Sequence, residues 1–561
     1  MNKKNLKITR LINKMNKLFF AAIFLSLFSM NSFAQNENPP VTPADNQPQP
    51  PSNNPTVQPP LELPTFIIEG VEQLNIKAGM KQFPSPPTVL SMTELDSLNP
   101  LEKQQSLLVP PPSMPKGLEV QRYANGFLQA KGGMYATFDV LAGYGLKYEG
   151  YELYGKAGLA TSSGDVKNSD YGKFFVNINS DYIAPDIFWI FGGSRTRTIL
   201  NYTNSSFNQY GTIANLARKV NDFDISLVSD GNYEGVSFST GAGFRTLSIN
   251  QNVNGIDETC INGFLKVNSL FDDNLIGGKI DINIGTYQGK SMKLIDIAVS
   301  DEIYKDKMTF DGMLGYQLAA ASDGANQNSI IGKLGMSYLP NEKISIRGEF
   351  FTGLEKVFFH NHFYVNSYFD DFSNILLFPK INFALSGIVQ YLPHPKLGLT
   401  VSGGAKIYDK YAYFNSLDSN KIELLFEQAS VLFVKAELFY ELSNVDKLIG
   451  FAGLNFGVLD YHSNAIPYLP MMEATLSYER NWFGKLSTEA GILFNSKRYT
   501  DKDNKKEINS YFNLFANINY NILNNFKIIA ELKNLTNNDN FIWQGYKERG
   551  IFGSIGISWN F

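Results

Sequence analysis

The chain has 561 residues, of which 43% are hydrophobic and 14% aromatic, but only 18% are charged. Length alone would suggest several soluble domains, and the aromatic content and low charge argue against that reading. The formal net charge is −4, and the single cysteine, Cys260, excludes an intrachain disulfide framework.

Residues 1–34 have the pattern of a secretory signal peptide. Six basic residues precede an apolar stretch from Leu18 to Met30, and Ser32-Phe33-Ala34 places small residues at positions −3 and −1 of a cleavage site. Thirteen apolar residues are too few for a membrane-spanning helix, which needs about 20. Removal of this segment leaves a net charge of −10, so nucleic acid is not an expected partner.

Residues 35–118 do not have the composition of a folded domain. Ten prolines fall within residues 39–64, so 35–60 is predicted to be a disordered, proline-rich linker. The following segment, 61–118, is expected to be periplasmic or lumenal. It contains LPTFIIEG, in which Phe66, Ile67, Ile68 and Glu69 could add a strand to the sheet edge of a partner. A strap packed against the rest of the protein is the alternative.

From about residue 119 to the end, apolar and polar side chains alternate along long segments, as in MEATLSYE (472–479) and FKIIAELK (526–533). Period-two alternation predicts strands with one apolar and one polar face. These segments are about twice as long as the 5–6 residues of common soluble strands, and they match the 9–11 residues or more of transmembrane strands. No stretch after the signal peptide is long and apolar enough for a membrane-spanning helix. Residues 119–561 are therefore predicted to form an all-β, transmembrane antiparallel β-barrel.

The connections between these segments alternate in length. NILNN (521–525) and PNEK (340–343) are short, whereas residues 354–379 and 536–550 are long. Short periplasmic turns and long outer loops are typical of barrels in the outer membrane of Gram-negative cells, which places both termini in the periplasm. Counting strands back from the C-terminus gives about 22, within an accepted range of 16–22, with the first strand near Gly126. The span 211–230 could be one long strand or a hairpin.

The last segment, IFGSIGISWNF, alternates strictly. Ile555, Ile557, Trp559 and Phe561 are expected to face lipid on the closing strand, which would pair with the first strand near residues 119–132. A terminal aromatic residue resembles the signal that the barrel assembly machinery recognises, so Trp559 and Phe561 are the predicted assembly signal.

The last 37 residues resemble the C-terminal end of TonB-dependent receptors. The resemblance is carried by Asn534-Leu535-Thr536-Asn537, by FIWQGYKERGIF and by the closing strand. Glu548-Arg549-Gly550 stands where the family usually has Pro-Gly-Arg. A barrel of about 22 strands is also the size class of these receptors.

This resemblance implies solute uptake across the outer membrane, with contacts to outer-membrane lipids and the assembly machinery. It also implies a TonB-type energy-coupling protein as a partner, for which residues 66–69 would be the TonB box. The family's folded plug has no counterpart of its size in the proline-rich residues 71–118. A docking barrel for another envelope protein and a passive pore therefore remain alternatives to uptake.

One predicted outer loop, FFHNHFYVNSYFDDF (358–372), combines aromatic rings with an H-x-H pair. On a strand, His360 and His362 would point to the same side and could ligate a metal, but two ordinary loop histidines are the simpler interpretation, and no metal or cofactor is expected. Its rings could contact a ligand, line the membrane interface, or belong to a loop folded into the lumen. The candidate ligand-contacting residues are Phe358, Phe359, His360, His362 and Tyr364. No motif of a hydrolase, zinc protease or nucleotide-binding enzyme occurs, and an enzyme is not expected.

Overall fold

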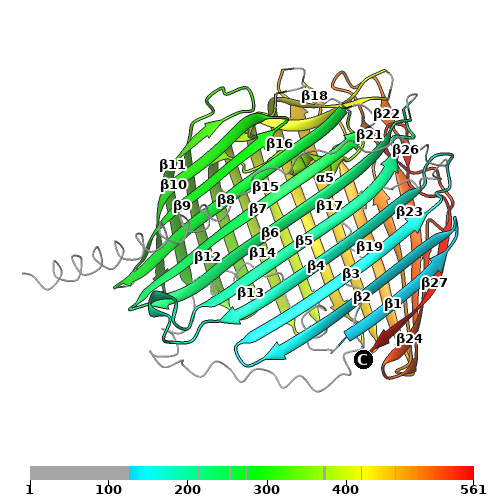
Figure 1. Ribbon diagram of the computed structural model, residues 1–561, viewed down its shortest axis with the longest axis horizontal. Helices are drawn as coiled ribbons and strands as arrows, with labels where there is room; N and C mark the ends of the chain where they lie inside the picture. Colours follow the sequence, from blue (N-terminus) through cyan, green and yellow to red (C-terminus); the bar gives the residue numbers. More distant parts are fainter. Residues whose placement is uncertain are drawn as a thin grey trace, which may run out of the picture.

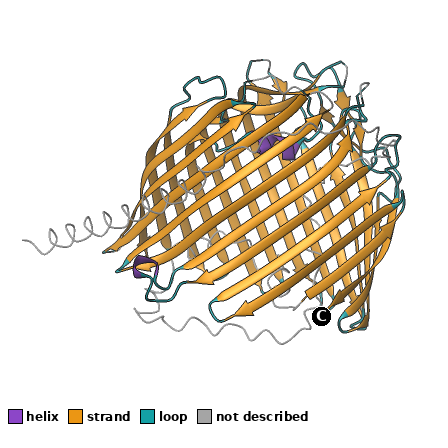
Figure 2. Cartoon of the chain, viewed as in Figure 1, coloured by secondary structure: helices purple, strands orange, loops and turns teal. Residues whose placement is uncertain are grey.

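The computed structural model describes residues 126–561, apart from 213–214, 252–253, 273, 371–374, 419 and 462. These residues form one antiparallel sheet that closes on itself (Figures 1 and 2). The sheet has 23 strands, of which the two-residue strand β18 lies beside β17, and the other 22 form the barrel. The predictions for residues 1–118, including the signal peptide and Phe66 to Glu69, lie outside the described residues.

The predicted fold class and the count of 22 strands are confirmed. The barrel strands are β1 (Gly126–Gly133), β2 (Thr137–Tyr148), β3 (Tyr151–Ser162), β4 (Tyr171–Ile183), β5 (Arg195–Asn208), β6 (Ala217–Tyr233), β7 (Val236–Gln251), β8 (Asn254–Phe271), β9 (Asn274–Tyr287), β10 (Lys290–Lys305), β11 (Met308–Ala320), β12 (Ser329–Asn341), β13 (Ile344–Leu354), β14 (Lys380–His394), β15 (Leu397–Ser416), β16 (Ile422–Glu441), β17 (Asp446–Leu459), β19 (Met472–Trp482), β20 (Leu486–Asn495), β23 (Tyr511–Leu523), β24 (Phe526–Lys533) and β27 (Phe552–Asn560). The shorter elements are η2 (Trp189–Phe191), α5 (Phe359–Val365), β18 (Asn464–Ala465), β21 (Arg498–Tyr499), β22 (Glu507–Ile508), β25 (Phe541–Trp543) and β26 (Tyr546–Lys547). The ambiguous span 211–230 belongs mostly to one strand, β6.

The two faces of the barrel wall have different chemistry. On β27, Ile555 is 64% exposed on the outer face, whereas Ser558, three residues further along the strand, is 5% exposed on the inner face. Inward-facing charges pair across strands, as in Lys131 with Glu531, where Nζ and Oε1 are 3.0 Å apart. A continuous exposed apolar band of this size is unfavourable in water, so the outer face is suited to lipid. Among the described residues, no helix has the length and apolar character that crossing a membrane requires.

The barrel closes where the first and last strands meet. Strand β1 pairs with β2 on one side and with β27 on the other, with Leu128 opposite Trp559. The backbone N–H of Phe561 donates to the carbonyl of Gly126 at 2.8 Å, and its ring stacks on Tyr144. A Cβ at Gly126 would lie 2.6 Å from the Phe561 ring, so the glycine allows the ring to pack closely against the backbone of β1. The predicted closing pair is confirmed, while the role of Trp559 and Phe561 in assembly stays a prediction.

We expect Ile555→Arg to destabilise the barrel by about 2–4 kcal/mol, because it places a charge on the lipid face near the middle of the closing strand. Ser554→Arg is the matched control, since Ser554 lies on the inner face opposite Glu531. Urea titrations of the two variants refolded into lipid vesicles measure the difference. Equal unfolding free energies would contradict the assignment of the two faces.

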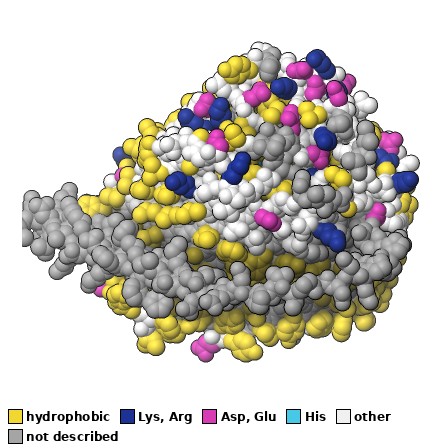
Figure 3. All heavy atoms as spheres, turned by 45° about the horizontal axis from the view of Figure 1, so that its top comes forward, with side chains coloured by type: hydrophobic (Ala, Val, Ile, Leu, Met, Phe, Trp, Pro, Cys, Tyr) yellow, Lys and Arg dark blue, Asp and Glu magenta, His cyan; other side chains and the backbone are white. Residues whose placement is uncertain are grey.

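The connections differ at the two ends of the barrel. Only two residues join β12 to β13, and only two join β23 to β24, whereas residues 355–379 join β13 to β14. The chain end at Phe561 lies at the end with the short turns (Figure 1). In a view tilted toward the long-loop end, charged side chains lie over the upper part of the molecule, and hydrophobic ones are dense along its left side and lower edge (Figure 3). The predicted alternation of short and long connections holds from β11 to the C-terminus. It fails nearer the N-terminus, where only two residues join β7 to β8 and β9 to β10 at the long-loop end, and residues 184–194 join β4 to β5 at the other end.

Candidate functional site

The connection 355–379, called here the inner loop, folds into the barrel (Figure 2). Its aromatic residues Phe359, Phe369 and Phe378 are almost completely buried. They belong to one apolar cluster with fully buried wall residues such as Leu247 on β7 and Leu294 on β10. An apolar cluster on the inner face is unusual for a lumen, which is otherwise polar. The apolar side chains of the wall and the inner loop therefore bury each other at this end of the barrel.

A buried carboxylate on β8 holds the start of α5. Glu258 is 2% exposed, and its oxygens accept hydrogen bonds from the backbone N–H of Phe359 at 2.6 Å and of His360 at 3.0 Å. The Nδ1 atom of His360 lies 2.7 Å from the same carboxylate. The first amides of a helix have no hydrogen-bond partner inside the helix. Here they donate to the Glu258 carboxylate, and these bonds in turn stabilise its buried negative charge.

A buried arginine on β6 holds the second half of the inner loop. Arg218 is 0% exposed, and its Nη2 donates to the carbonyl of Phe369 at 2.8 Å, while Nη1 donates to the carbonyl of Ser367. Nη2 also lies 3.5 Å from the Asp370 carboxylate. Burial raises the pKa of Asp370, and the charge of Arg218 opposes that rise. Gln209 adds a bond to the carbonyl of Tyr368 at 3.0 Å.

A third polar contact fixes the end of α5. Arg245 on β7 forms a two-point ion pair with Asp222 on β6, with distances of 3.0 Å and 2.6 Å. The Tyr364 hydroxyl donates to the same carboxylate, and the Arg245 guanidinium lies 5.3 Å from the centre of the Tyr364 ring. Burial raises the pKa of Tyr364, so the phenol keeps its proton and donates at neutral pH. Lys356 adds an ion pair with Asp281 on β9 at 3.6 Å, and the Asp370 N–H donates to the carbonyl of Ile422 on β16 at 2.7 Å. The inner loop is thus attached to the wall at several separate points.

A second long connection, between β24 and β27, packs onto the inner loop. The Tyr546 ring stacks on Tyr368 with centroids 3.7 Å apart, and Tyr210 contacts both rings. Trp543 packs edge-on against Phe414 at 5.3 Å. The two loops therefore form one continuous aromatic layer inside the long-loop end of the barrel, which we call the loop layer.

The structure places the predicted loop residues inside the lumen, which is one of the three arrangements that the sequence left open. Phe358, Phe359 and His362 are buried, and His360 is mostly buried. The H-x-H pair lies on α5 and not on a strand, and residues two apart on a helix point to opposite sides, so a shared chelate is wrong. His362 packs edge-on against Phe426, and burial lowers its pKa to about 3. Direct ligand contact by the five predicted residues stays a prediction.

Comparisons with known proteins identify the fold. No family model matches the chain, and no curated protein matches its sequence. Solved structures match over 78% of this chain. They include the siderophore receptor PiuA from Acinetobacter baumannii (12% identity, TM-score 0.59, 82% of its chain), the copper transporter OprC (12%, 0.60, 80%) and the FrpB iron transporter from Neisseria meningitidis (9%, 0.63, 81%).

These likenesses define the fold. The chain has the closed 22-strand barrel of TonB-dependent outer-membrane receptors, and the sequence resemblance in its last 37 residues is confirmed at the level of fold. The fold also supports the outer membrane as its location. The structures named above are receptors and transporters.

Proposed function

We propose that this protein takes up a solute across the outer membrane, with its long loops outside the cell and both termini in the periplasm. One observation carries the proposal: a barrel with the fold of uptake receptors has its long-loop end occupied by its own loops. The polar attachments of the inner loop are hydrogen bonds and ion pairs that can break and re-form, so a solute that binds the loop layer could displace the loop. The short turns and long loops support the orientation.

The proposed uptake requires energy coupling in the periplasm, and the segment from Phe66 to Glu69 is the proposed contact for a TonB-type protein. An extended apolar segment on a proline-rich tether would add a strand to the partner through backbone hydrogen bonds. The solutes named for the similar structures are iron, siderophores and copper, and an iron-chelate or metal solute is the first class to test.

We expect Ile67→Pro to weaken binding of a TonB-type periplasmic domain at least tenfold, because proline removes a backbone donor and disrupts strand addition. Isothermal titration of the purified protein with that domain measures the change. Val57→Pro, in the neighbouring proline-rich tract, is the matched control and should bind as the wild type does. Equal binding by all three proteins would contradict a coupling role for residues 66–69 and favour the docking or pore alternatives.

A further inference from the structure

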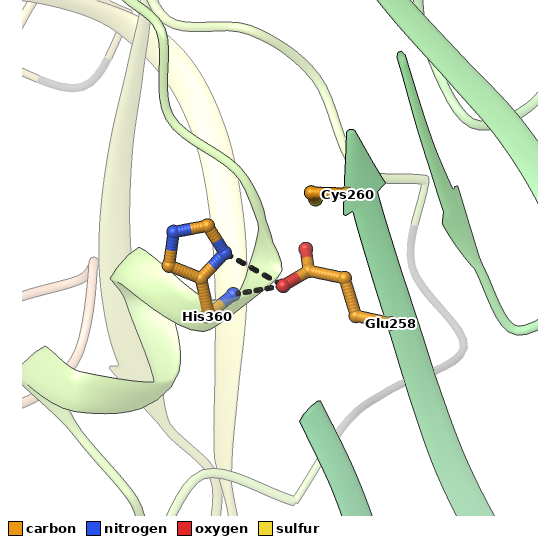
Figure 4. Close-up of side chains that lie close together, drawn as sticks. All are labelled: Glu258, Cys260 and His360. Carbon is orange, nitrogen blue, oxygen red and sulfur yellow. Dashed lines mark hydrogen bonds and ion pairs between the residues drawn. The ribbon is translucent and has the colours of Figure 1, made fainter. Parts of the chain in front are cut away.

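Three metal-ligating side chains of different types meet below the start of α5. Glu258 and Cys260 lie two residues apart on β8, so both side chains point into the lumen. His360 reaches them from the inner loop (Figure 4). Their ligand atoms all lie within 4.8 Å of one another. Glu258 and Cys260 are buried, and His360 keeps 13% of its side chain exposed.

This combination of ligands is selective. A thiolate, an imidazole and a carboxylate together suit Zn²⁺ and similar borderline-soft divalent ions, whereas Ca²⁺ and Mg²⁺ prefer oxygen ligands alone. We propose that Glu258, Cys260 and His360 bind one zinc-class divalent ion, which joins the inner loop to β8. Three protein ligands leave a fourth position for water or a solute group.

The surroundings of the Cys260 sulfur restrict where such an ion could bind. Gly285 on β9 is the strand partner of Cys260, and a Cβ there would lie 3.1 Å from the Cys260 sulfur and 3.1 Å from the Phe358 ring. The glycine therefore allows the Phe358 ring to pack on this flank of the sulfur, and the proposed ion lies on the side that faces Glu258 and His360. Ligand atoms around a tetrahedral zinc ion are roughly 3.3–3.8 Å apart, so the 2.7 Å contact between Glu258 and His360 must widen by about 0.6 Å or more.

The existing hydrogen bonds permit this change. Glu258 Oε1 can keep its bond to the Phe359 N–H while Oε2 turns to the ion. His360 then coordinates through Nδ1 and carries its proton on Nε2, and the Cys260 thiol releases its proton to solvent. Since only His360 comes from the inner loop, ion binding and docking of the loop stabilise each other.

The single cysteine makes the test direct, because any sulfur–metal signal in this chain reports Cys260 alone. The untagged, purified full-length protein is titrated with Co²⁺ and followed by absorption spectroscopy. We expect one equivalent to bind with a near-ultraviolet sulfur-to-cobalt band and visible tetrahedral bands, and Zn²⁺ to remove both. Cys260→Ser should abolish the near-ultraviolet band, and His360→Gln should weaken Co²⁺ binding about tenfold or more. His394→Gln, at the end of β14 on the opposite side of the barrel, should change neither.

A second measurement needs no variant. Zn²⁺ should slow the reaction of Cys260 with a maleimide in the wild-type protein, and a chelator should restore the rate. The proposal is overturned if the near-ultraviolet band is absent and Zn²⁺ leaves the maleimide rate unchanged, or if His360→Gln binds Co²⁺ as tightly as the wild type. These outcomes do not depend on solute uptake or on energy coupling, so the metal site and the proposed function can fail separately.

Discussion

Replacing residues 356–378 with a short Gly-Ser linker is expected to convert a silent barrel into a steadily conducting pore. The inner loop contributes much of the loop layer, and a barrel of 22 strands is wide enough to conduct once its lumen is cleared. The deletion is geometrically simple, because the Glu355 N–H donates to the Pro379 carbonyl at 2.8 Å. The ends of the removed segment are therefore already side by side, and the β13–β14 pairing is kept.

The measurement is the current through single proteins in a planar bilayer. The matched control lacks residues 35–118 and keeps the inner loop, so it isolates the contribution of the N-terminal segment. Current in the loop variant alone identifies the inner loop as the barrier. Current in the control alone would show that the N-terminal segment closes the lumen and would contradict the prediction. A large steady current from the unaltered protein would favour the passive pore over gated uptake.

The barrel could be predicted because each residue of a transmembrane strand faces either lipid outside the barrel or the polar lumen inside it. Lipid on one side and water on the other impose period-two alternation, which is visible locally in segments such as 526–533. The strand count and the closing pair followed from counting alternating segments and turns. The pairing of Leu128 with Trp559 joins residues at opposite ends of the barrel sequence, but closure of any barrel requires such a pair.

The loop layer could not be predicted in the same way. Arg218 and Glu258 occupy inward-facing strand positions, where polar residues are ordinary, so nothing in their local sequence distinguishes them. Their partners, Phe369 and Phe359, are 151 and 101 residues away along the chain. The dense rings of residues 358–372 were the one available signal, and folding into the lumen was one of three interpretations. The H-x-H interpretation failed because seven residues are too few for a helix to show its period.

Arg218→Met is expected to weaken docking of the inner loop on the wall while leaving the barrel intact. Methionine is similar in length and apolar, but it cannot donate to the carbonyls of Ser367 and Phe369 or pair with Asp370. Removing one partner of a buried charge pair costs about 3–5 kcal/mol, because the remaining polar groups stay buried without a donor. The strand pairing of β6 does not depend on this side chain, so the cost falls on docking of the inner loop.

Hydrogen exchange of amides in residues 355–370 measures that cost, and a loss of about 3 kcal/mol corresponds to exchange about 100-fold faster. Arg195→Met is the control, because Arg195 is 47% exposed in its ion pair with Asp181, and such pairs contribute only about 0–1 kcal/mol. The inner-loop amides of Arg195→Met should exchange at the wild-type rate. If Arg218→Met also exchanged at that rate, the apolar cluster alone would hold the loop, and displacing the polar attachments would not suffice to open the barrel.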